Sequence, residues 1–175
     1  MNRIVLFLAM TAAPGLTFAA NTNVITFNGQ VASQTCTVSV NGSAANPVIL
    51  MPTVSAAALT AVGSTAGETP FTISVSGCTA PTSNLAIKTA FLGNNVTSAG
   101  NLANAGTASN VQVQLLNAAG GSAVVLNGIT SVSGLTLNSG ATSASHDFAV
   151  RYISEAGAAT AGTVSATAQY ALDYL

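Results

Sequence analysis

The sequence predicts an all-β sandwich, and three observations lead to this fold class. Short segments of alternating apolar and polar residues recur at a spacing of roughly 8–12 residues, which is typical of two packed antiparallel sheets. Glycine, proline and asparagine separate these segments, as turns between strands require. No segment combines helix caps with a sustained helical period. At 175 residues, the chain has the length of one domain, and it contains no internal repeat or linker that would divide it.

The first predicted strand, residues 24–31, is amphipathic. Ile25, Phe27, Gly29 and Val31 lie on one face of this strand, because alternate residues of a strand point to the same side. Gly29 leaves a dent in this face, where another backbone or side chain can approach closely. Further strands of the N-terminal half are predicted at residues 35–40, 48–51, 71–78 and 85–91.

Residues 55–66 allow two interpretations. Leu59 and Val62 have the spacing of one helical turn, whereas Gly63, Gly67 and Pro70 favour a loop. The next strand begins clearly only at Phe71.

The C-terminal half contains a hairpin signal, because residues 117–121 include two glycines between two apolar runs. Residues 94–104 are predicted to be a polar loop, and residues 155–162 join the last two strands. The strands of this half are predicted at residues 111–116, 124–126, 135–137, 148–153 and 166–175.

The last segment, residues 166–175, alternates like a half-buried strand up to the final residue. Tyr170, Leu172 and Tyr174 lie on one face, and Leu175 ends the chain. Terminal residues usually fray unless a neighbour holds them. We therefore expect another protein molecule to lie beside this strand.

Composition separates the chain from several classes of protein. Charged residues make up 4% of the sequence, against roughly 25% in soluble domains. Disordered chains are charged and poor in apolar residues, whereas regularly spaced Val, Ile, Leu and Phe indicate folding here. So few basic residues argue against binding of nucleic acid. A surface with little charge favours a polymer over a free soluble protein.

The N-terminus has the features of a secretory signal peptide, residues 1–19. Arg3 precedes an apolar stretch that is too short to span a membrane, and small residues follow. Cleavage after Ala19 is favoured. The alternative, cleavage after Ala20, would place Phe18 where a small residue is preferred.

Two cysteines remain after the signal, Cys36 and Cys78. In an exported protein, an even pair predicts a disulfide rather than two free thiols. The bond would close a loop of roughly 43 residues and stabilise the fold by about 4 kcal/mol. A metal site is not predicted, because His146 is the only histidine.

Residues that could support catalysis are scarce, and we predict that the chain is not an enzyme. His146 and Asp147 are neighbours on a predicted strand, so their side chains would point to opposite faces. No Gly-x-Ser-x-Gly elbow occurs, and no Lys-Ser/Thr pair follows Gly120 and Gly121. No catalytic residue, cofactor or metal ligand is therefore predicted.

Several segments form a recognisable series along the chain: residues 27–31 before Cys36, residues 69–73 before Gly77 and Cys78, residues 110–115 with 125–128, residues 148–152, and residues 162–174 with Tyr174 near the end. Taken in this order, they resemble the subunits of chaperone–usher fimbriae, and above all the type 1 fimbrial major pilins. Each motif alone is weak, but their order and spacing extend over the whole mature chain.

This resemblance implies an incomplete immunoglobulin-like β-sandwich (residues 32–175) that lacks its final strand. It also implies an N-terminal donor-strand extension (residues 20–31) with Val24, Ile25, Phe27, Gly29 and Val31. The implied acceptor groove and chaperone-facing strand carry Tyr170, Leu172, Tyr174 and Leu175. A periplasmic chaperone is expected to lend a strand first. At an outer-membrane usher, the extension of the next identical or related pilin would replace it.

The implied function is that of a structural subunit of an adhesive fimbrium, which supports cell adhesion after export through the periplasm to the bacterial surface. The alternative is a minor adaptor or a single-domain adhesin that binds a host glycan or surface. The short extension before Gly29 is typical of some adaptors, whereas the scarcity of aromatic residues and the absence of Trp argue against a sugar site.

Overall fold

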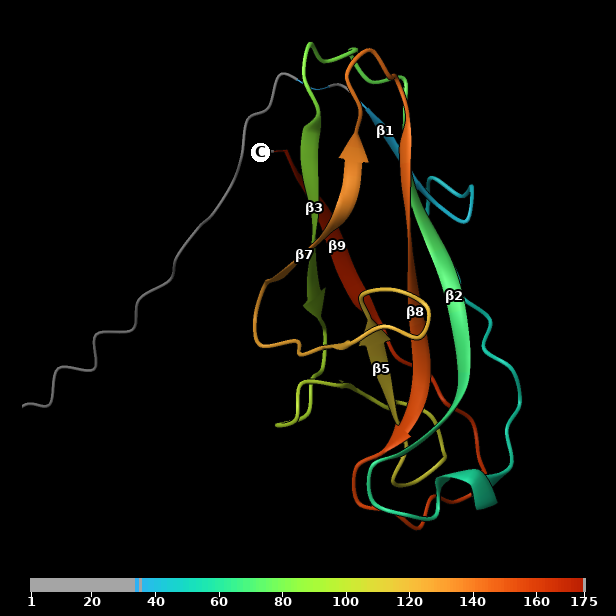
Figure 1. Cartoon of the computed structure of the whole chain (residues 1–175). Coiled ribbons are helices and arrows are strands. Elements are labelled where there is room, and N and C mark those ends of the chain that lie inside the picture. The colour runs from blue at the N-terminus through green and yellow to red at the C-terminus, as the bar shows by residue number, and fades with distance from the viewer. Residues whose placement is uncertain (1–33, 35, 175) are drawn as a thin grey trace, which may run out of the picture.

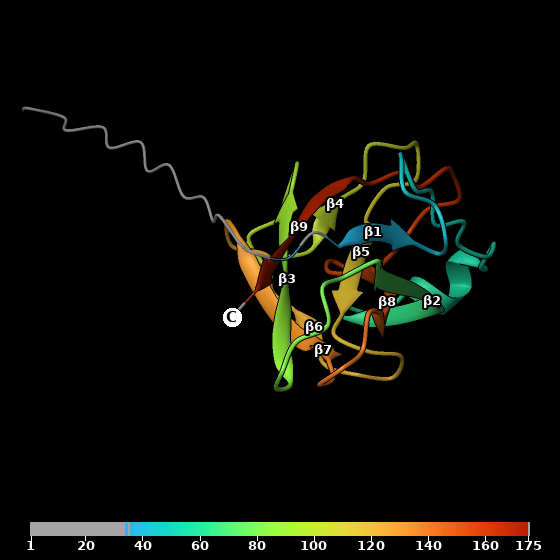
Figure 2. The same ribbon diagram turned by 90° about the horizontal axis from the view of Figure 1, so that it is seen from above.

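The computed structural model describes residue 34 and residues 36–174. This part of the chain contains nine β-strands and one short 3-10 helix, and the strands form two facing layers (Figures 1 and 2). The strands are β1 (Thr37–Val40), β2 (Ser64–Ser76), β3 (Leu85–Gly93), β4 (Leu102–Ala103), β5 (Gln112–Leu116), β6 (Ala123–Val124), β7 (Thr130–Leu137), β8 (Ala144–Ser154) and β9 (Ala168–Tyr174). The predicted all-β sandwich is confirmed.

The larger sheet has the order β1-β2-β8-β5-β4, with β6 paired to β5, and the smaller sheet has the order β7-β3-β9. All pairings are antiparallel. Strands that are distant in sequence become neighbours: β9, the last strand, pairs with β3, and β8 lies between β2 and β5. This crossing order is typical of sandwich folds, in which the chain passes repeatedly between two sheets.

The core lies between the two sheets; β2 and β3 contribute alternate residues to it, whereas β5 and β8 also bury consecutive residues. Phe71, Ile73 and Val75 of β2 are buried together, as their alternation predicts. The other buried apolar side chains of the strands are Val40, Ile87, Phe91, Leu102, Val113, Leu115, Leu116, Val124, Leu135, Leu137, Phe148, Ala149 and Val150. Burial of these side chains is the main force that holds the sheets together.

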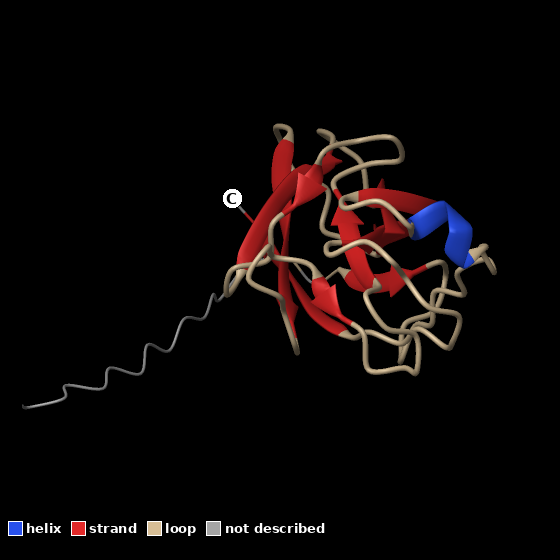
Figure 3. Ribbon diagram, turned by 90° about the horizontal axis from the view of Figure 1, so that it is seen from below, coloured by secondary structure: helices blue, strands red, loops and turns tan. Residues whose placement is uncertain are grey.

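The sequence allowed either a helical turn or a loop for residues 55–66, and the structure contains a helical turn in only part of this segment. Ala56–Leu59 form the 3-10 helix η1 at the rim of the sandwich (Figure 3), where Ser55 caps it by accepting a hydrogen bond from the Ala57 N–H. Leu59 is buried and anchors this turn. Within the described residues, no helix has the length and apolar character to cross a membrane.

Strand β2 begins at Ser64, which is earlier than predicted, and it runs through both expected strand breakers. Gly67 adopts a positive φ of 65° where the pairing with β8 shifts between Ala66 and Thr69, so the bulge accommodates it. The Thr72 N–H bonds to Asn41 on the β1 side, and Pro70 directs its nitrogen to the same side, past the end of β1. The missing N–H of Pro70 therefore interrupts no pairing.

The prediction of a β-strand at residues 48–51 is wrong. These residues belong to neither sheet, although Ile49 and Met51 pack against the core and Val48 and Leu50 point outward. Three smaller corrections concern extent: the loop predicted at residues 94–104 contains the short strand β4, and both β7 and β8 begin earlier than expected, at Thr130 and Ala144. The predicted strand 24–31 lies outside the described residues.

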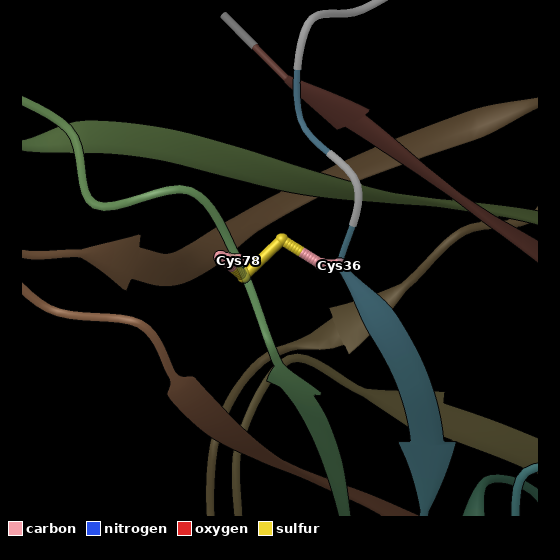
Figure 4. Close-up of a disulfide and its surroundings, with 2 residues drawn as sticks. All are labelled: Cys36 and Cys78. Atoms are coloured by element: carbon pink, nitrogen blue, oxygen red, sulfur yellow. A yellow bond between two sulfur atoms is a disulfide. The ribbon is translucent and has the colours of Figure 1, made fainter.

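The predicted disulfide is confirmed. Cys36 precedes β1 and Cys78 follows β2, and the bond joins them at the end where the two strands are paired (Figure 4). Their Cα atoms are 4.2 Å apart. Cys78 is buried beside Val75 and Ile87, so the bond also closes one end of the core.

Candidate functional site

An apolar groove of about 540 Å³ opens between residues 47–51 and residues 164–170. Its floor comes from both sheets, because Phe91 of β3 lies beside residues of β2, β5 and β8. The lining consists of Val40, Pro47, Val48, Ile49, Leu50, Met51, Phe71, Ile73, Phe91, Leu102, Val113, Leu115, Val150, Tyr152, Val164, Ser165, Ala166, Thr167, Ala168 and Tyr170. The groove thus gives access to the core of the sandwich.

The lining contains no charged residue. A small-molecule site of this size usually combines apolar walls with a few convergent polar groups. Here the side-chain polarity is limited to the hydroxyl groups of Ser165, Thr167, Tyr152 and Tyr170. The groove therefore suits an apolar ligand that does not depend on charged recognition.

The main chain supplies the missing polarity along one wall. The carbonyl groups of Thr163, Ser165 and Thr167 accept hydrogen bonds from the loop around residues 94–108. Since alternate residues of an extended chain direct their main-chain groups to opposite sides, Val164 and Ala166 direct theirs toward the groove. No group among the described residues bonds to the main chain of these two residues.

The same alternation continues into β9. Ala168 lies opposite Gly93, and the Asn94 N–H bonds to the Thr167 carbonyl, so the residues of β9 that bond to β3 are the odd-numbered ones. Ala168, Tyr170 and Leu172 therefore present their main chain to the open side, and the side chains of Tyr170 and Leu172 pack onto the core. Within the described chain, β9 pairs with β3 alone. An open strand edge thus borders an open apolar groove.

The opposite edge of the smaller sheet, formed by β7, is less suited to the addition of a strand. Between Ile87 and Thr89, β3 pairs with a bulged part of β7, which contains Gly134. The imidazole of His146 packs so closely over Gly134 that an added Cβ would collide with the ring. The pairing of β9 with β3 shows no such shift over its seven residues. A bulge discourages strand addition, and the pairing of β9 with β3 contains none.

The predicted groove residues occupy different positions along β9. Tyr170 lines the groove. Leu172 packs against both main parts of the core, and Tyr174 packs beside the disulfide end, where burial raises the pKa of its phenol above 10.0. Neither residue lines the groove, although both lie on the same face as Tyr170. Leu175 and the predicted donor residues Val24, Ile25, Phe27, Gly29 and Val31 lie outside the described residues.

The second wall, residues 47–51, was missed by the sequence analysis. Ile49 and Met51 are packed inward, and Val48 and Leu50 are 84% and 88% exposed. The signal was present as an apolar run between Pro47 and Pro52, which predicted a paired strand. The prolines also explain why the run stays unpaired, because they limit its pairing at both ends.

Residues that could take part in catalysis do not gather around the groove. His146 Nε2 lies 2.8 Å from the Asn117 carbonyl oxygen, and Asp147 accepts a hydrogen bond from Thr72 at 2.6 Å on the other side of the strand. Among the described residues, no group of three His, Cys, Asp or Glu side chains could hold a metal ion.

Comparison with known proteins gives consistent matches. The sequence model of the family described as "Fimbrial protein" matches residues 25–175. The chain is 37% identical to the F17 fimbrial protein of Escherichia coli, over 94% of both chains. It is 31% identical to the minor fimbrial subunit HifD of Haemophilus influenzae, over 99% of this chain and 82% of that one. The crystal structure of the P pilus rod subunit PapA superimposes with a TM-score of 0.60 at 20% identity, covering 79% of this chain and 99% of PapA.

Proposed function

The chain belongs to the fimbrial protein family and is a structural subunit of a fimbrium, and we propose that it polymerises by donor-strand exchange. In this proposal, the groove beside β9 accepts residues 20–31 of another subunit. The observation that carries the proposal is the coincidence of an open strand edge with a groove that exposes the core. A strand satisfies both at once, because its main chain bonds to the edge while alternate side chains enter the groove.

The dimensions of the two partners support this assignment. The wall from residue 164 to residue 170 spans seven residues, or about 23 Å of extended chain. The segment from Ile25 to Val31 also has seven residues, and in an extended conformation it would place Ile25, Phe27, Gly29 and Val31 on one face. Three of these are apolar side chains of the kind that an uncharged groove accepts.

A groove on one subunit and a strand on the next make a heterologous contact, which grows filaments rather than closed rings. The chain accordingly assembles with other pilin subunits in a surface fimbrium, as its family does. Before assembly, the open edge of β9 and the groove would favour aggregation. This hazard supports a periplasmic chaperone that covers the groove and an outer-membrane usher where the exchange occurs. We assign the chain no catalytic activity, in keeping with a family of structural subunits.

A second candidate role is that of a minor adaptor in the fimbrium. The 31% identity with HifD, a minor subunit, over nearly the whole chain favours this role. A major rod subunit and a minor adaptor differ in their copy number within one filament. Quantitative immunogold labelling would separate them, because a rod subunit labels the whole shaft and an adaptor labels one position.

The experiment that tests strand exchange compares two substitutions on neighbouring residues of the extension. Phe27→Asp places a carboxylate on the face that enters the uncharged groove, and Thr26→Asp places the same charge on the outward face. We expect Phe27→Asp to abolish filaments in electron micrographs and Thr26→Asp to preserve them. Both variants should still bind the chaperone, because each retains its own groove.

Equal numbers of filaments from the two variants would contradict the proposed exchange. Loss of chaperone binding in Phe27→Asp alone would also contradict it, since the extension would then act in folding of its own subunit.

A further inference from the structure

We propose that Asn104 is a positioning residue for strand binding, which fixes the main-chain groups that the groove presents to an incoming strand. This inference rests on the proposed function and deepens it. Asn104 lies just after β4, outside the groove lining, and acts through Thr163 and Ser165, which flank Val164 at the start of the groove wall.

Asn104 uses the full hydrogen-bonding capacity of its side-chain amide. Its Oδ1 atom accepts from the Gly106 N–H at 2.7 Å and from the Ser165 N–H at 2.9 Å. Its Nδ2 atom donates to the Ala108 carbonyl at 2.8 Å and to the Thr163 carbonyl at 3.3 Å. An amide has two donors and two acceptor positions, so all four are engaged. Two of the four bonds hold the wall, and two hold the loop that supports it.

The wall needs such support because residues 163–167 belong to no sheet. Besides Asn104, a reciprocal pair of threonines joins the loop to the wall. The Thr107 N–H donates to Thr163 Oγ1 at 3.0 Å, and the Thr163 N–H donates to Thr107 Oγ1 at 2.9 Å. Glycines permit this close approach: a Cβ at Gly106 would collide with the Thr163 carbonyl, and a Cβ at Gly162 would collide with the Ala108 backbone.

The bonds from Asn104 act together with main-chain bonds from the Ala105 and Ala108 N–H groups to fix which way the wall faces. Because Ser165 gives its N–H to Asn104 and its carbonyl accepts from the Ala105 N–H, both of its main-chain groups point away from the groove. Val164 and Ala166 consequently point theirs into the groove and their side chains onto the core. A slip of one residue would reverse every one of these directions. Asn104 therefore sets the register in which a donor strand can pair.

The test uses the full mature chain carrying Phe27→Asp, so that its own extension does not compete for the groove, with a fluorescent peptide of residues 20–31 as the probe. Asn104→Ala is compared with Asn84→Ala, a matched control that loses a single asparagine bond, to the Ser139 N–H at 2.9 Å, away from the groove. We expect Asn104→Ala to weaken peptide binding at least about tenfold in fluorescence anisotropy, equivalent to roughly 1.4 kcal/mol. Asn84→Ala should bind the peptide as the original chain does.

A second readout does not depend on the peptide. In amide hydrogen exchange by NMR, Ser165 should be protected in the original chain and should lose protection in Asn104→Ala. Asn104→Asp keeps the two acceptor positions and should retain part of this protection. Unchanged Ser165 protection in Asn104→Ala would overturn the inference, and so would equal loss of peptide affinity in Asn84→Ala. Failure of the unsubstituted chain to bind the peptide would instead contradict the proposed function.

Discussion

Phe91 of β3 packs edge to face on Phe148 of β8, with the ring centroids 5.2 Å apart and the planes inclined by 81°. Phe148 also stacks on Phe71 of β2 at 5.7 Å. The three rings join the two sheets, and Phe71 and Phe91 are at the same time part of the groove floor. The sandwich thus exposes part of its central packing to the groove.

Phe148→Ala should destabilise the chain by about 3–5 kcal/mol, because the ring is almost fully buried and two aromatic partners would border the cavity. The measurement is urea unfolding followed by circular dichroism. Phe148→Leu is the control, since it keeps most of the apolar volume and should cost clearly less. Equal midpoints for the two variants would show that the loss of stability does not depend on the volume of the cavity.

Thr89→Val should stabilise the fold by about 1 kcal/mol. The Thr89 hydroxyl is buried and has no hydrogen-bond partner among the described residues, so the folded state bears the cost of its desolvation. Valine has the same shape without the hydroxyl. Thr72→Val serves as the matched control, because it removes a hydroxyl that donates to Asp147 at 2.6 Å. A lower urea midpoint for Thr89→Val would indicate a partner beyond the described residues.

Gly67→Ala and Gly140→Ala should differ in cost although both glycines have a positive φ, of 65° and 76°. A Cβ at Gly67 would lie 2.9 Å from Tyr152 and from Val54, whereas a Cβ at Gly140 would meet nothing within 4 Å. Gly140→Ala should therefore show only the backbone strain, about 1 kcal/mol, and Gly67→Ala should lose more. Thermal unfolding of both variants gives the comparison. Similar losses would mean that Tyr152 moves aside freely.

Replacing Cys36 and Cys78 together by serine should destabilise the fold by about 4 kcal/mol, since the bond closes a loop with a sequence separation of 42. We expect a reduced yield of folded chain in an oxidising compartment. A reducing agent should lower the urea midpoint of the original chain and leave that of the double variant unchanged. Insensitivity of both to the reducing agent would argue against a stabilising role of the bond.

Stability should fall in alkaline solution. Burial raises the pKa of Tyr152 and of Tyr174 above the ordinary value of 10.0. Since the pKa is higher in the folded than in the unfolded chain, their contribution is complete below pH 10.0 and is lost as the pH rises through the folded-state pKa. Urea midpoints at about pH 8 and about pH 11 measure the effect. Replacing Tyr152 and Tyr174 by phenylalanine should reduce the difference between the two midpoints. An unchanged difference would show that other groups cause the loss of stability.

Predictions from the sequence succeeded where a local pattern is sufficient. Alternation in β2 identified Phe71, Ile73 and Val75 as one buried face, and two cysteines in an exported chain identified the disulfide. The start of β2 was misplaced, because Gly67 and Pro70 are strand breakers in general. They are tolerated here at a bulge and beyond the end of β1, and both circumstances depend on neighbouring strands.

The groove was predicted on one side only. Tyr170 follows from the alternation of the last strand, whereas the wall at residues 47–51 carries the same pattern as a paired strand. The hydrogen bond from the Ser165 N–H to the Asn104 side chain joins residues 61 positions apart, and no local sequence pattern predicts it.

The sequence by itself determined the fold class, the inward faces of β2 and β9, the disulfide pair and the family resemblance, because these depend on residue type, spacing and order. Only the tertiary structure decided which edge stays open. Whether a strand is paired depends on which segments the fold brings beside it, and in this chain β7 is bulged whereas β9 borders the apolar groove.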